Sequence, residues 1–102
     1  MNIQNAGKNV RLIVNADDFG LTLKVNRGIV ESHRFGIVTS ASVFANGPAF
    51  ENALNDVRDN PKLGLGIHLN VLRGKSVSDP RFTPTITKNG FFFFDCGLYH
   101  SD

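Results

Sequence analysis

Three short apolar segments, separated by more polar stretches, dominate the first two thirds of the chain. The segment at 10–16, VRLIVNA, is almost continuously apolar, which is typical of a strand covered on both faces in a parallel sheet. The segment at 37–45, IVTSASVFA, is rich in β-branched residues, and the one at 62–71, KLGLGIHLNV, alternates with a period of two. The pattern therefore predicts a strand in each segment.

Helical spacing occupies the interval between the first two predicted strands. Val25, Ile29 and Val30 fall on one face of a helix in LTLKVNRGIVESHRF. Thr22 precedes this pattern and is suited to cap the N-terminus, because its hydroxyl can accept a hydrogen bond from a free backbone N–H. Gly36 follows the pattern and is expected to cap the C-terminus.

A second helix is expected between the second and third strands. Asn46-Gly47-Pro48 opens it, with Pro48 at the first helical position, where a missing N–H costs nothing. The helix is expected to stop before Asn60-Pro61, because a residue that precedes proline disfavours helical geometry. It runs through four apolar residues, Phe50, Ala53, Leu54 and Val57.

The predicted order of strand, helix, strand, helix, strand indicates an α/β fold with parallel strands and right-handed crossovers. After Leu72 the pattern gives way to Gly, Ser, Asp and Pro, so residues 73–90 are expected to form a long loop. The length of 102 residues allows one small domain at most, which we assign to 1–102.

Composition and charge exclude several classes of protein. The chain is 41% hydrophobic and 20% charged with a formal net charge of +2, and its eleven Lys and Arg residues are scattered, which argues against nucleic-acid binding. No apolar stretch approaches the roughly 20 residues needed to cross a bilayer, so no membrane partner is expected. The single cysteine, Cys96, excludes an internal disulfide and suits the reducing cytoplasm, where we expect the protein to reside.

Polar side chains stand at the end of each predicted strand. Asp17 and Asp18 follow the first strand, Asn46 follows the second, and His68 and Asn70 lie at the end of the third. Functional groups gather at the carboxyl ends of the strands in parallel α/β folds. We therefore expect these side chains to meet at one edge of a sheet with strand order 1-2-3.

The third predicted strand has an apolar face and a face of small and polar residues. Its alternation places two glycines on the same face as His68 and Asn70, and the glycines leave space beside the imidazole. That face is typical of the floor of a polar cavity. The alternative is a structural histidine with tightly packed glycine neighbours, and periodicity leaves both interpretations open. The apolar face comprises Leu63, Leu65 and Ile67.

The tandem acids need a break in regular strand geometry, because adjacent strand residues point to opposite faces. Phe19-Gly20 is expected to supply a turn that lets both carboxylates reach one site. A single acid at this junction could simply cap the following helix. Two acids in tandem after a buried strand favour a functional site.

Two other classes of protein place acids in similar local sequences. A kinase Asp-Phe-Gly site is excluded, because no Gly-rich loop, strand lysine or catalytic loop precedes Asp17. A phosphorylated receiver domain needs an aspartate at the end of its third strand, where this chain has His68. A receiver-like or sugar-binding module without catalytic activity stays as the alternative to a hydrolase.

Two segments of the chain resemble the YdjC/ChbG family of carbohydrate deacetylases: NADDFGLTLKVNRGIVESHRFGIVTSASVFANGPAFENA and NPKLGLGIHLNVLRGK. The resemblance runs from about Leu12 to Gly74 and continues more loosely through SVSDPRFTPTITKNGFF. It implies that the chain is the N-terminal βαβαβ portion of a distorted (β/α) TIM-like barrel. It also implies a metal-dependent hydrolase that removes N-acetyl groups from amino-sugar oligosaccharides.

The resemblance carries roles onto residues of this chain. Asp17 becomes the candidate catalytic base, and Asp18 and His68 become candidate ligands of a divalent metal, Mg²⁺ or Zn²⁺. The two acids could exchange these roles. Asn46 and Asn70 are candidate substrate-binding residues, and the implied partner is an N-acetylated oligosaccharide. An unpaired edge on so short a sheet also leaves a homo-oligomer open.

The chain departs from the family in what it lacks. The family needs a further metal-binding histidine from a later histidine-rich segment, and nothing in this sequence matches that segment. At ~30 residues per βα unit in a barrel of ~250 residues, 102 residues supply only about three units. We therefore expect a partial deacetylase that is inactive alone.

Overall fold

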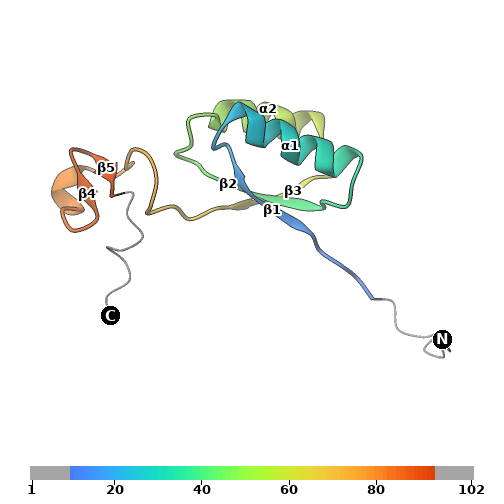
Figure 1. The fold of residues 1–102 in the computed structure, drawn as a ribbon, viewed down its shortest axis with the longest axis horizontal. Helices are drawn as coiled ribbons and strands as arrows, with labels where there is room; N and C mark the ends of the chain where they lie inside the picture. The colour runs from blue at the N-terminus through green and yellow to red at the C-terminus, as the bar shows by residue number, and fades with distance from the viewer. Residues whose placement is uncertain (1–9, 94–102) are drawn as a thin grey trace.

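Strands and helices alternate through most of the part of the chain, residues 10–93, that the computed structural model describes. The three main strands are parallel and pair in the order β1-β2-β3. Both main helices lie on the same side of this sheet (Figure 1). The α/β fold and the strand order predicted from the sequence are therefore confirmed. The elements are β1 (Asn15–Phe19), α1 (Leu23–Arg34), β2 (Ser40–Val43), α2 (Phe50–Asp59) and β3 (Gly64–Ile67).

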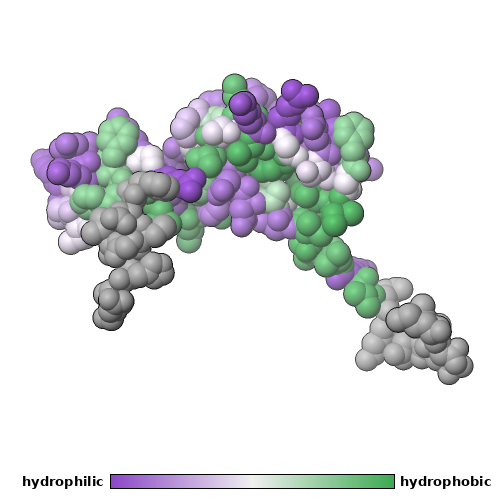
Figure 2. Space-filling view, in the orientation of Figure 1, coloured by the Kyte–Doolittle hydropathy of each residue, from purple (hydrophilic) through white to green (hydrophobic). Residues whose placement is uncertain are grey.

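The first strand begins later than the predicted 10–16. Residues 10–14 lie outside β1, and Val10, Leu12 and Ile13 are 91%, 73% and 78% exposed. Figure 2 shows this apolar surface on the segment that leads into the sheet. The prediction of a strand covered on both faces is therefore wrong here, because β2 begins only at Ser40 and the segment extends past its partner.

The other two strands are also shorter than predicted. They occupy Ser40–Val43 and Gly64–Ile67 instead of 37–45 and 62–71, because a parallel ladder forms only where both strands run side by side. The apolar face of β3 is covered at Leu63 alone, since Leu65 and Ile67 are 42% and 67% exposed. The helices therefore leave most of this face of β3 uncovered, whereas Phe19 on β1, the other edge strand, is 0% exposed.

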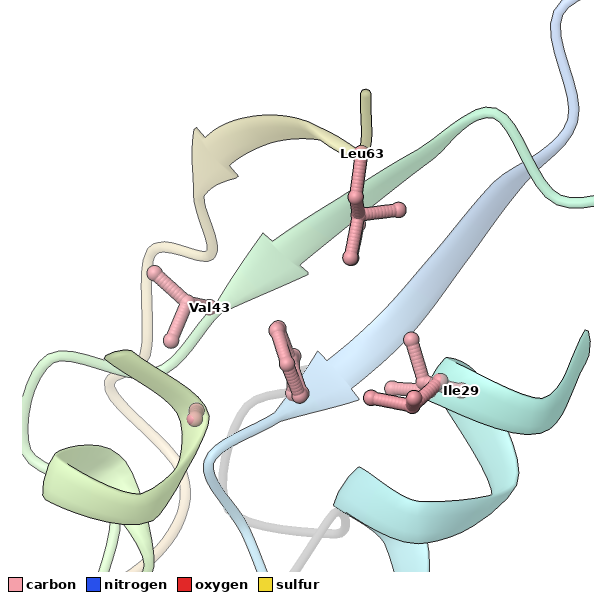
Figure 3. Close-up of a cluster of buried hydrophobic side chains, with 7 residues drawn as sticks. Ile29, Val43 and Leu63 are labelled. Carbon is pink, nitrogen blue, oxygen red and sulfur yellow. The ribbon is translucent and has the colours of Figure 1, made fainter. Parts of the chain in front are cut away.

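The core lies between the sheet and the two helices. Figure 3 shows Ile29 on α1, Val43 on β2 and Leu63 before β3 pointing into this space. Phe19 and Val43 are 0% and 1% exposed, and burial of such a side chain contributes about 1.5–3 kcal/mol. The buried cluster consists of Phe19, Ile29, Val30, Ala41, Val43, Ala53 and Leu63.

The start of α1 follows the prediction and its end does not. The hydroxyl of Thr22 accepts a hydrogen bond of 3.1 Å from the N–H of Val25, as expected of an N-cap. The C-cap is Phe35, one residue before the predicted Gly36. The reason is that the N–H of Phe35 already bonds the carbonyl of Glu31 with Phe35 in right-handed helical geometry.

The second helix begins after a turn and not at Pro48. Ala49 is its N-cap, because the N–H of Ala49 bonds the carbonyl of Gly20 at 2.9 Å and fixes the chain before Phe50. A β carbon on Gly47 would overlap the same Gly20 carbonyl oxygen, so only glycine fits this approach. The predicted end before Asn60-Pro61 is confirmed, since α2 ends at Asp59.

The predicted loop at 73–90 contains more order than expected. A 3-10 turn, η1 (Pro80–Phe82), is followed by a short antiparallel hairpin of β4 (Thr87–Lys88) and β5 (Phe91–Phe92). Asn89 and Gly90 join the two strands with φ values of 53° and 80°, the conformation that a two-residue hairpin turn favours. The long loop was predicted without this turn and hairpin, and the Asn-Gly pair was the sequence signal for the hairpin.

Charge in this region is local. Asp79 caps η1, and its hydrogen bonds with the guanidinium and backbone N–H of Arg81 hold the pKa of the Asp79 carboxyl below its usual range. Both side chains face solvent, so they add little to stability.

Among residues 10–93, no helix combines the length and apolar composition that a bilayer crossing requires.

One buried amide joins the turn after β1 to the start of α2. Asn26 carries a polar side chain but is 0% exposed, because it lies on the core-facing side of α1. Its Oδ1 accepts from the N–H of Gly20 at 2.6 Å, and its Nδ2 donates to the carbonyl of Ala49 and to Oδ1 of Asn52. Asn26 thus joins the turn after β1 to the segment before α2, which carries Asn46.

Replacing Asn26 with leucine should lower the free energy of unfolding of this chain by about 2–4 kcal/mol. The side chain keeps a similar volume, but the buried Gly20 N–H loses its partner, and the Ala49 carbonyl keeps only the N–H of Ala53. Urea denaturation measures the loss, and amide exchange at Gly20 should accelerate. The control Asn52→Ala removes one bond to Asn26 and should cost about 1 kcal/mol or less. Equal effects from both variants would contradict this role.

Candidate functional site

The tandem acids lie at a β-bulge in β1. Ala16 pairs with Ala41 and Phe19 with Val43, so β1 takes three residue steps where β2 takes two. Asp18 has a φ of 66°, in the left-handed region that costs a non-glycine residue about 1–2 kcal/mol. Such bulges re-aim side chains beside active sites. The predicted Phe19-Gly20 turn follows, but the break in alternation occurs earlier, at Asp18.

His68 directly follows β3 and faces Asp18. The His68 N–H bonds the Val43 carbonyl at 2.8 Å, which continues the ladder by one residue. The imidazole stacks on Phe44, with ring centroids 4.1 Å apart and planes inclined by 21°. The backbone hydrogen bond places His68 next to β2, and the stacking on Phe44 orients the plane of its ring.

The contact between Asp18 and His68 brings an imidazole nitrogen and a carboxylate together. Nδ1 of His68 lies 3.3 Å from the backbone N–H of Asp18 and 3.5 Å from its Oδ1. A backbone N–H can only donate, so Nδ1 presents its lone pair toward Asp18. The two side chains are 29% and 44% exposed, which leaves the pair accessible to a ligand.

Asp17 lies on the face of the sheet that the helices leave bare. Ala41 and Val43 are buried toward the helices, so Ser40 and Ser42 alternate to the opposite face. Oδ1 of Asp17 accepts a 2.9 Å hydrogen bond from Nδ2 of Asn15, which also bonds Ser42. The exposed carboxylate of Asp17 is therefore anchored to the first strand of the sheet.

Asn46 and Asn70 meet and organise the loop after β3. Nδ2 of Asn70 donates to Oδ1 of Asn46 at 3.1 Å, and Nδ2 of Asn46 donates to the Lys75 carbonyl. Asn70 also accepts from the N–H groups of Leu72 and Arg73. Much of the hydrogen-bonding capacity of both amides is therefore used to shape the loop.

Two cavities adjoin His68. Asp18, His68 and Asn70 together line a cavity of about 270 Å³, and Asn46 lines a neighbouring one of about 300 Å³ that also includes His68 and Asn70. Asp17 is not among the lining residues of either. The structure thus brings four of the five candidate residues around two adjoining hollows and sets Asp17 beside them on the open face.

The donor atoms of Asp18 and His68 suit a divalent cation. Two ligand atoms each about 2.1 Å from a tetrahedral ion lie about 3.4 Å apart, and Nδ1 of His68 lies 3.5 Å from Oδ1 of Asp18. A metal bound by this pair would replace the Asp18 N–H that Nδ1 accepts, because one lone pair cannot serve both. Within residues 10–93, no group of three or more His, Cys, Asp or Glu side chains is arranged to hold a metal. The described residues therefore offer one candidate pair of ligand atoms at a suitable spacing and not a full set.

Comparison with known proteins places these residues in a family context. A protein named carbohydrate deacetylase from Brevibacillus brevis is 49% identical over 78 residues, which cover 76% of this chain and 31% of that protein. A protein named chitooligosaccharide deacetylase from Salmonella paratyphi B is 48% identical over 79 residues, which cover 78% of this chain and 30% of that protein. The chain thus spans about a third of these relatives.

A solved structure has a similar fold. A crystal structure from Enterococcus faecalis, which carries the provisional name of a cellobiose-phosphate cleavage protein, superposes with a TM-score of 0.82. It is 33% identical, and the match covers 90% of this chain and 37% of that one. The parallel βαβαβ arrangement is consistent with part of a TIM-like barrel. The model of the YdjC-like protein family matches residues 11–100, and the chain belongs to that family.

Proposed function

We propose that this chain supplies part of the active site of a metal-dependent hydrolase that removes N-acetyl groups from amino-sugar oligosaccharides. The contact of Asp18 with His68 across the ends of β1 and β3 carries the proposal. The names of the relatives support the reaction class, and the chain spans about a third of their length. The activity is therefore proposed for the whole protein.

Asp18 and His68 would hold the metal. Imidazole and carboxylate together suit Zn²⁺ better than Mg²⁺, which prefers oxygen ligands alone. A catalytic zinc commonly takes about three protein ligands, so a further ligand is required besides these two. A bound cation would polarise the acetamide carbonyl and the attacking water.

Asp17 would act as the base, and the contacts favour this assignment over the exchanged one. Asp18 touches His68, whereas Asp17 contacts Asn15 and faces the open side of the sheet. An exposed carboxylate there can take a proton from an attacking water. Asn46 and Asn70 would contact the sugar from the cavities that they line, although both also bond the loop.

The chain alone should bind Zn²⁺ weakly through Asp18 and His68. His68→Gln and Asp18→Asn should each weaken binding at least about tenfold, because loss of even a residue that supports a metal ligand costs 10–100-fold. Isothermal titration calorimetry measures the affinity. The matched control His33→Gln removes an imidazole on α1 that bonds the Val38 carbonyl and should change nothing. Equal losses for both histidine variants would contradict the site.

A full-length relative with the same NADDFG and GIHLN segments should release acetate from chitobiose. Asparagine at the position of Asp17 should lower kcat about 10²–10⁴-fold, because an amide cannot accept the water's proton. Alanine at the position of His68 should abolish turnover and leave the circular dichroism spectrum intact. Sugar binding without acetate release by the unmodified relative would favour the non-catalytic sugar-binding alternative.

A further inference from the structure

A compact hydrogen-bonded group occupies the bare face of the sheet next to the bulge. Asn15 lies at its centre, at the first position of β1 and opposite Ser40 in the strand register. The amide of Asn15 contacts Ser40, Ser42 and Asp17, with donor–acceptor distances of 2.7, 2.9 and 2.9 Å. The two serines lie two residues apart on β2 and therefore share a face.

The two serines fix which way the amide of Asn15 points. The hydroxyl of Ser40 donates to Oδ1 of Asn15, and the hydroxyl of Ser42 accepts from Nδ2. With Oδ1 engaged by Ser40, the second hydrogen of Nδ2 is directed at Asp17. A flipped amide would set its oxygen against the carboxylate, which repels it, so the group has one favourable arrangement.

Asn15 engages one oxygen of Asp17 and leaves the other available. Oδ1 of Asp17 accepts the amide hydrogen bond, whereas Oδ2 has no hydrogen-bond partner among residues 10–93. The carboxylate stands at a bulge, where strand geometry alone does not set its direction. The amide therefore supplies an orientation that the backbone does not.

We propose that Asn15 is a positioning residue that holds Asp17 in the geometry required to accept a proton through Oδ2, with Ser40 and Ser42 orienting its amide. This inference rests on the proposed role of Asp17 as the base. A base must lie within hydrogen-bond reach of the proton it removes, and misplacement by about 1 Å can cost about a hundredfold in rate. Asn15 acts through Asp17 and does not touch the reacting atoms.

The test compares Asn15→Ala and Asn15→Asp in a full-length relative that shares NADDFG and carries serines at the positions of Ser40 and Ser42. Each should lower kcat for acetate release from chitobiose about 10–100-fold and change KM less than about twofold. Asn15→Asp keeps the shape but replaces the N–H donors with a second carboxylate that repels Asp17, so it remains informative if the alanine variant fails to fold. Asn55→Ala, an exposed asparagine on α2, serves as the matched control with unchanged kcat.

Two readouts on the present chain separate positioning from a merely structural role. Zn²⁺ affinity should be the same in Asn15→Ala and the unmodified chain, because Asp18 and His68 keep their contact. In NMR spectra, Asp17→Ala should shift one Nδ2 proton of Asn15, and Ser42→Ala should shift the other. Parallel losses of folding, Zn²⁺ affinity and kcat in both Asn15 variants would overturn the positioning role in favour of a structural one.

The outcomes also separate this inference from the proposed function. An active relative whose kcat is insensitive to both Asn15 variants would overturn the positioning role and leave the proposed function standing. A relative without deacetylase activity before any substitution would refute the proposed function, and the positioning role with it. Loss of kcat with KM, folding and Zn²⁺ affinity retained supports both.

Discussion

Between Ala16 and Phe19, β1 contains one residue more than the stretch of β2 with which it pairs, and this extra residue forms a β-bulge. The extra residue forces Asp18 into a left-handed conformation and ends the alternation that would send neighbouring side chains to opposite faces. As a result Asp18 meets His68 while Asp17 joins the polar group on the bare face. The placement of both carboxylates depends on this bulge.

The loops around the bulge are held by contacts that join separate parts of the chain. Asn26 on α1 bonds the turn after β1 and the segment before α2, and the carbonyl of Gly20 accepts from Ala49. Phe44, which follows β2, supports the His68 ring. Because left-handed conformations of this kind persist where the surrounding structure over-determines them, these contacts explain how the bulge is maintained. Stability and site geometry thus share the same residues.

Sequence patterns were sufficient for the order of elements, the parallel sheet and the cap at Thr22, because each depends on local propensity and periodicity. The strand bounds were wrong because they depend on where a partner strand begins, as at Ser40. The bulge had no local signal, since Asp18 is not a glycine. The pairing of His68 with Asp18 followed from the rule that strand ends carry functional groups, although it joins residues fifty positions apart.

The buried and supporting polar residues were harder to predict. Asn26 lies at a helix position that periodicity assigns to the apolar face, and only its partners across two loops explain its burial. Asn15 was included in the NADDFG segment without a role, because the role proposed for it depends on serines in another strand. The Asn89-Gly90 turn was readable from sequence, and its hairpin adds an element at the end of the predicted loop.

We propose a metal centre at Asp18 and His68, and anomalous diffraction from Zn²⁺-soaked crystals of this chain would locate the ion. We expect an anomalous peak between the two side chains, within about 2.0–2.2 Å of a carboxylate oxygen of Asp18 and of an imidazole nitrogen of His68. Peaks at other histidines, such as His33, with none between Asp18 and His68 would contradict it.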